Sequence, residues 1–128
     1  MGLDMNAYRI AAEKLGEAQV DFEIDFDEAV ELHYWRKHPN LHGWMQQLYV
    51  EKGGAERDPV GFNCVPVRLE EADLDRLETA IRAGNLPETS GFFFGASDGS
   101  EWQGDLGFIE KARSALLEGD AVLYSSWW

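Results

Sequence analysis

The sequence from His33 to Trp44 reads HYWRKHPNLHGW and marks the passage from a strand into a helix. Residues 30 to 35 alternate with the period of two that is typical of a strand. Pro39 fits the first position of a helix, where its missing N–H costs nothing. Apolar residues then recur at helical spacing, at Leu41, Trp44, Met45, Leu48 and Tyr49. The stretch therefore predicts a strand followed by an amphipathic helix that ends at Gly53-Gly54.

Further strands are predicted on both sides of this unit, at residues 2–10, 20–26, 62–67 and 121–128. The pattern is clearest at 20–26, because Val20, Phe22, Ile24 and Phe26 alternate with acidic residues. Pro66 lacks an N–H for a ladder, so the strand at 62–67 is expected at a sheet edge or to end there.

Two more helices are predicted, at residues 70–83 and from about residue 100 to Gly119. Strands and helices do not alternate as they do in a doubly wound sheet. We therefore expect one α+β domain over residues 1–128, with a mainly antiparallel sheet of about five strands packed with three helices. The predicted core comprises Phe22, Ile24, Trp44, Leu48, Leu74, Leu77, Ile109 and Leu116.

The chain is acidic, with 11 Lys and Arg against 24 Asp and Glu and a formal net charge of −13. Such a charge repels nucleic acid and anionic membranes, and it either favours a basic partner or simply keeps the protein soluble. The sequence contains no long apolar run of the kind that forms a membrane span or a secretory signal. We expect a cytoplasmic protein, a monomer or a homodimer, that binds neither nucleic acid nor membrane.

Cys64 is the single cysteine and lies in the apolar run NCVPV, so it is expected to be buried and slow to react. His38 and His42 share one side of the predicted helix and could share a metal ion. Zinc sites need further ligands, and no HExxH motif or cysteine pair supplies them. We expect no metal and no cofactor.

Arg36 and Lys37 precede the predicted helix start, where backbone N–H groups and the helix macrodipole favour an anion. Trp35 and Trp44 could wall such a site, and His42 is the candidate general base. The alternative is that both cations form ion pairs with neighbouring carboxylates. The sequence from Gly91 to Gly95, GFFFG, is expected either to be buried on both faces or to expose one ring to a ligand or partner.

Four segments, GLDMNAYRI, YWRKHPNLHGW, PETSGFFFG and YSSWW, resemble a family of small proteins encoded by phages and by bacteria that carry prophages. The resemblance extends from the first residue to the last, and the acidic segment 17–31 departs from the family pattern. Some members carry a phosphoglycerate kinase label, which this short chain does not support. The resemblance implies that the segments meet in space as a core wall or a pocket, with ligand-binding candidates Trp35, Arg36, Lys37, His42, Trp44, Phe93 and Tyr124.

The sequence is compatible with two functions. The favoured hypothesis is a non-enzymatic interaction module, a phage accessory factor that binds a host or phage protein through an aromatic and acidic surface. The alternative is a protein, or a small enzyme, that binds a small anion or nucleotide-like ligand with Arg36, Lys37 and His42.

Overall fold

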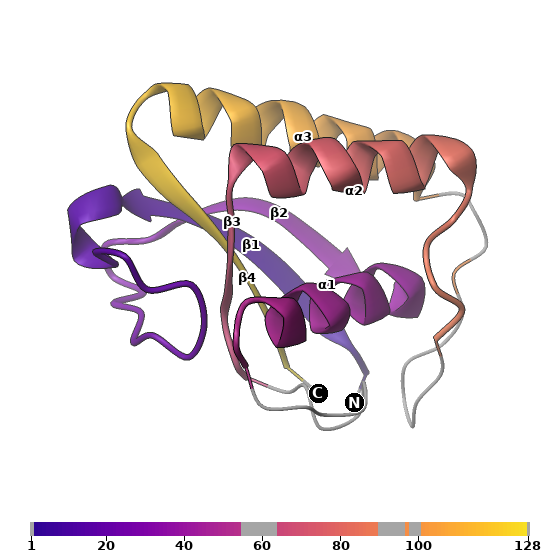
Figure 1. Cartoon of the computed structure of the whole chain (residues 1–128), viewed down its shortest axis with the longest axis horizontal. Coiled ribbons are helices and arrows are strands. Elements are labelled where there is room, and N and C mark those ends of the chain that lie inside the picture. Colours follow the sequence, from indigo (N-terminus) through magenta and orange to yellow (C-terminus); the bar gives the residue numbers. More distant parts are fainter. Residues whose placement is uncertain (1, 55–63, 90–96, 98–100, 128) are drawn as a thin grey trace.

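A computed structural model of the chain describes residues 2–54, 64–89, 97 and 101–127. These residues form an α+β fold with one four-stranded sheet and three α-helices (Figure 1). The elements, in chain order, are β1 (Asp4–Ala11), a short 3-10 turn (Ala12–Lys14), β2 (Val30–Arg36), α1 (Pro39–Glu51), β3 (Val67–Leu69), α2 (Glu71–Ala83), α3 (Trp102–Leu117) and β4 (Asp120–Trp127).

The sheet has the strand order β2-β1-β4-β3, and every neighbouring pair is antiparallel. The first and last strands occupy its centre and pair from Asp4 opposite Trp127 to Ala11 opposite Asp120. This pairing brings the two ends of the chain close together (Figure 1). The predicted α+β class with a mainly antiparallel sheet is confirmed, with four strands among the described residues where about five were expected.

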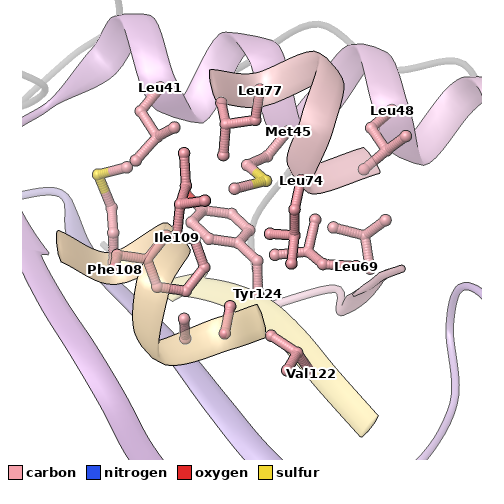
Figure 2. Packing of buried hydrophobic residues seen from close by; sticks show 14 of the residues in the cluster. Leu41, Met45, Leu48, Leu69, Leu74, Leu77, Phe108, Ile109, Val122 and Tyr124 are labelled. Carbon is pink, nitrogen blue, oxygen red and sulfur yellow. The ribbon is translucent and has the colours of Figure 1, made fainter. Parts of the chain in front are cut away.

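The three helices pack on one face of the sheet and enclose the main core. Met5, Ala7 and Val122 point from the central strands toward the helices, because alternate residues of a strand share a face. Figure 2 shows Tyr124 pointing from β4 into the same cluster. The helices contribute Leu41, Met45, Leu48, Leu74, Leu77, Phe108 and Ile109.

The opposite face of the sheet carries a smaller apolar cluster, in which Ile10, Ala121 and Leu123 are buried. Phe22 and Ile24 pack against it from the segment between β1 and β2. This face has no helix over it among the described residues, and it remains open in part.

The strand predicted at 20–26 is wrong. Val20 forms an isolated bridge with Val67, and the residues after it do not join the sheet. Asp21 has a φ of 55°, a left-handed conformation that is incompatible with continued pairing. The alternation correctly predicts burial, since Val20, Phe22 and Ile24 are partly buried. The segment lies across the sheet face instead of adding a strand to it.

The three helices are confirmed. The first begins at Pro39 as predicted. Glu70 and Asp73 form a reciprocal capping box at the start of α2, and Gly84 ends this helix in a left-handed conformation. Of the predicted core residues, Leu48, Leu74, Leu77 and Ile109 are buried, and Phe22, Ile24, Trp44 and Leu116 are partly buried against the core. Among the described residues, no helix has the length and apolarity needed to cross a membrane.

The segment around Cys64 differs from the prediction. The strand expected at 62–67 begins only at Val67, and residues 62 and 63 lie outside the described part. Cys64 has a φ of 59° and is exposed, so the prediction of a buried thiol is wrong. The physical reason is that Cys64 lies in a left-handed turn ahead of β3 and not in a strand. Residues 55–61 also lie outside the described part of the chain.

Candidate functional site

Three of the predicted site residues meet in the interior of the protein. The His42 Nδ1 atom lies 2.7 Å from the Tyr124 hydroxyl oxygen, and both side chains are fully buried. The Trp35 ring centroid lies 6.5 Å from that of Tyr124. Burial raises the pKa of Tyr124 well above its ordinary value, although a hydrogen bond with Ser126 opposes the rise. The three residues form a core wall, and His42 is not accessible to a ligand in this conformation.

Arg36 and Lys37 are exposed and lie at the end of β2. Arg36 stands opposite Asp4 in the register, and its Nε lies 3.7 Å from an Asp4 carboxylate oxygen. Lys37 has a φ of 54°, and its backbone N–H donates to the Leu3 carbonyl at 2.8 Å. The ion pair that was the alternative to an anion site is therefore present at Arg36.

The remaining two candidates lie elsewhere. Trp44 is partly buried and lines a pocket of about 140 Å³ with Gln47, Leu48, Glu51 and Arg76. Phe93 and the GFFFG segment lie outside the described residues. The predicted seven residues thus do not form one pocket within the described part of the chain.

A polar chain of three residues, not predicted as a unit, occupies the start of α1. His38 is almost fully buried there, and its Nε2 lies 2.9 Å from Asp105 Oδ2. Its Nδ1 lies 2.6 Å from Ser97 Oγ. The other Asp105 oxygen accepts the indole N–H of Trp35 at 2.8 Å. The backbone N–H of Asn40 donates to Ser97 Oγ at 3.2 Å.

These residues border a cleft of about 190 Å³, which we call the His38 cleft. It is lined by His38, Asn40, Ile81, Gly84, Leu86, Ser97, Glu101, Trp102 and Asp105. A Glu101 carboxylate oxygen lies 3.6 Å from His38 Nδ1. Two carboxylates in one small cleft disfavour an anionic ligand. The described residues contain no group of three or more His, Cys, Asp or Glu side chains that could hold a metal ion.

Sequence reasoning singled out His38 only as a metal ligand and missed Ser97, Glu101 and Asp105. One signal was present for Asp105. It stands four residues before Ile109 on the apolar stripe of α3, and a carboxylate on such a stripe needs buried partners. Nothing in the sequence brings Ser97 to the start of a helix that lies about 60 residues earlier in the chain.

Another concave region lies on the face of the sheet that the helices leave open. This open-face groove has a volume of about 350 Å³. It is lined by Asn6, Tyr8, Phe22, Ile24, Phe26, Cys64, Pro66, Ser125, Ser126 and Trp127. Phe26 and Trp127 expose 57% and 63% of their surface. Tyr8 meets Phe26 edge to face, with ring centroids 5.3 Å apart.

The segment that supplies Phe22, Ile24 and Phe26 to the groove is strongly acidic. Glu23, Asp25 and Asp27 alternate with these apolar residues and are exposed. Within the described part of the chain, none of the three carboxylates forms a salt bridge. Burial and the nearby Glu31 carboxylate raise the pKa of Tyr8, in line with a negative field on this face.

Comparison with protein-family models, with curated proteins and with solved structures finds no match to this chain. Its function must therefore be inferred from its own residues.

Proposed function

We propose that this protein is an interaction module that binds a protein partner in the open-face groove. The observation that carries the proposal is the exposure of Phe26 and Trp127 in one concave apolar site. Covering large, half-exposed aromatic side chains with a partner removes much apolar surface from water, so such side chains contribute strongly to the free energy of binding. The groove has the size for one or two apolar side chains of a partner segment.

Charge defines the partner further. The carboxylates of Glu23, Asp25 and Asp27 border the apolar residues of the groove, and the whole chain has a net charge of −13. Complementary charge steers association and excludes partners of the same sign. The partner segment should therefore carry large apolar side chains flanked by Lys or Arg.

The resemblance to phage and prophage proteins supports a biological setting for this module. In that setting it acts in the bacterial cytoplasm, as a monomer or a homodimer, on a host or phage protein. The acidic surface supports a basic protein segment as the ligand over nucleic acid or an anionic membrane.

The test is affinity capture from a bacterial lysate with matched variants. Phe26→Ser and Trp127→Ser remove the exposed rings of the groove and should abolish capture of the partner. Leu117→Ser is the control, because Leu117 is 90% exposed but lies at the end of α3, outside the groove. Capture should also weaken as salt rises from 50 to 500 mM, since the charges involved are exposed.

A partner captured equally by wild type, by both groove variants and by Leu117→Ser would contradict the proposal. A synthetic peptide of the captured segment gives a second measurement. Its affinity should fall when its Lys and Arg residues are replaced by Glu, and the groove variants should not bind it.

A small-anion or nucleotide-like ligand at Arg36 and Lys37 is the second candidate. It is favoured by the convergence of the two side chains over Gly2, where a Cβ would lie 2.9 Å from Lys37 Cε and 3.1 Å from an Arg36 guanidinium nitrogen. Thermal unfolding in phosphate, nucleotides and carboxylates tests it. A ligand at a hundred times its dissociation constant should stabilise the fold by about 2.7 kcal/mol, and Arg36→Ala should remove that gain.

A further inference from the structure

Ser97, His38 and Asp105 form a continuous hydrogen-bonded chain at a site separate from the open-face groove. Asp105 accepts on both carboxylate oxygens, one from the Trp35 indole N–H and one from His38 Nε2. Because a carboxylate only accepts, the Nε2 atom carries a proton. In the neutral imidazole, Nδ1 then has a lone pair. With the Ser97 oxygen 2.6 Å from Nδ1, that lone pair is placed to accept the hydroxyl hydrogen of Ser97.

This arrangement has the three roles of an activated serine. A hydroxyl is hydrogen-bonded to a base, and a buried carboxylate orients the base. In this site Nδ1 contacts Ser97 and Nε2 contacts the carboxylate. In most serine triads the two nitrogens have the opposite partners. Such constellations are defined by geometry and roles, and either nitrogen can accept the proton.

The surroundings of Ser97 suit a developing negative charge next to it. The first turn of α1 lies beside its hydroxyl, because the Asn40 N–H donates to Ser97 Oγ at 3.2 Å. The N-cap residue of α1, His38, forms no side-chain capping hydrogen bond with that first turn. Backbone N–H groups and the positive end of the helix dipole stabilise an oxyanion at such a place.

The walls of the His38 cleft define the substrate class. Ile81, Leu86 and Trp102 provide apolar surface, and the volume of about 190 Å³ fits a small acyl group. The carboxylates of Glu101 and Asp105 oppose an anionic substrate in a protein that is already strongly negative. The volume and charge of the cleft therefore favour neutral or cationic esters with a short acyl chain as substrates.

We propose that Ser97 is the nucleophile and His38 the general base of an esterase site in this cleft. Ser97 Oγ forms a bond to the ester carbonyl carbon while its proton passes to His38 Nδ1. The bond from that carbon to the alcohol oxygen breaks, and the alcohol leaves with the same proton. Water then attacks the acyl-serine, gives one proton to His38, and releases the carboxylic acid as Ser97 regains its hydrogen.

The competing explanation is purely structural: Ser97 and His38 tie residue 97 to the start of α1 through their hydrogen bonds. A fluorophosphonate probe separates the two explanations, because it phosphonylates activated serines and leaves ordinary ones unmodified. Mass spectrometry of the labelled full-length protein should find one adduct, on Ser97. An unlabelled protein, or an adduct on any residue other than Ser97, overturns the proposal.

Turnover of p-nitrophenyl acetate and butyrate provides the second measurement. It is made in a Cys64→Ala background, because the exposed Cys64 thiol can itself be acylated. Ser97→Ala and His38→Gln should each lower kcat by about 100-fold or more. Asp105 is a positioning residue, and Asp105→Asn should lower kcat while KM stays within about twofold.

A variant that fails to fold would leave these rates ambiguous, so circular dichroism and thermal unfolding accompany each one. Ser97→Cys in the Cys64→Ala background covers that case. The new thiol should react with iodoacetamide near neutral pH at least tenfold faster than Cys64 does in the native parent protein. This difference in reaction rate should disappear when His38→Gln is added to the Ser97→Cys variant. Equal thiol rates, or ester turnover that survives Ser97→Ala, overturn the assignment.

Discussion

The imidazole Nδ1 of His42 lies 2.7 Å from the hydroxyl oxygen of Tyr124, and neither side chain has exposed surface. This contact joins α1 to the central strand β4 inside the main core. A hydrogen bond with Ser126 also reaches the Tyr124 hydroxyl. Because the buried polar atoms satisfy one another, an aromatic and polar wall can exist in the centre of an apolar cluster.

Removal of the Tyr124 hydroxyl tests the energetic weight of this contact. Tyr124→Phe should lower the free energy of unfolding by about 1–3 kcal/mol, because His42 then loses a partner where water cannot replace it. Urea denaturation measures the change. Tyr34→Phe is the control, since the exposed Tyr34 hydroxyl donates to Asp4 at 2.5 Å and should cost within about 0.5 kcal/mol. Equal losses in the two variants would contradict the prediction.

Stability in alkaline solution should depend on the same hydroxyl. Burial raises the pKa of Tyr124 in the folded protein, whereas tyrosine in the unfolded chain titrates near pH 10. As pH rises above 10, the unfolded state releases this proton and the folded state retains it, so stability falls. Below that pH the group makes no contribution of this kind.

Urea denaturation at several pH values between 8 and 11 follows this effect. Tyr8 and Tyr34 also have raised pKa values and remain in both proteins, so the quantity of interest is the difference between wild type and Tyr124→Phe. Wild type should lose stability more steeply with pH than the variant. Parallel curves would exclude Tyr124 as the source.

The first helix and the segment from Val20 to Ile24 show which features can be predicted from the sequence and which cannot. Pro39 and the apolar spacing after it locate α1, because helix start and periodicity are local properties. The alternation at Val20, Phe22 and Ile24 predicts which side chains are buried, but not whether the backbone pairs with the sheet. Pairing depends on distant strands, and one left-handed residue, Asp21, is enough to end it.

The polar chain in the His38 cleft could not be predicted, for a related reason. His38 and Asp105 are 67 positions apart, and Ser97 belongs to a stretch without periodicity. Only the packing of α3 against β2 brings Asp105 to the Trp35 indole and to His38. The sequence could indicate that Trp35, His42 and Tyr124 share a region, but not that they face inward.

Cys64 should be reactive in the native protein. Its side chain is exposed at a left-handed turn, so a thiol reagent such as DTNB should reach it without unfolding. The native labelling rate should be within about tenfold of the rate in 6 M guanidinium chloride. A native rate several orders of magnitude below the unfolded rate would show that the thiol is covered, and would restore the expectation of a buried cysteine.

Lys52 should contribute more to the free energy of unfolding than an exposed lysine or arginine side chain does. Its Nζ lies 2.5 Å from Asp73 Oδ2, 2.6 Å from the Arg68 carbonyl oxygen and 2.9 Å from Gln19 Oε1. The Lys52 and Asp73 side chains are only 13% and 11% exposed. Lys52→Met keeps most of the stem but removes one ion pair and two charge-assisted hydrogen bonds, which join the end of α1 to α2, to β3 and to Gln19. The expected loss is about 1.5–3 kcal/mol.

The matched control is Arg76→Met. Arg76 pairs with Glu51 at 2.9 Å between the same two helices, but both side chains are more than half exposed. Exposed ion pairs contribute about 0–1 kcal/mol, so this variant should lose much less stability. Added salt should also weaken the Arg76 contribution, while the Lys52 contribution persists because water and ions are largely excluded from it. Similar losses for the two variants, with the same dependence on salt, would mean that the Lys52 contacts are no better shielded than an ordinary surface pair.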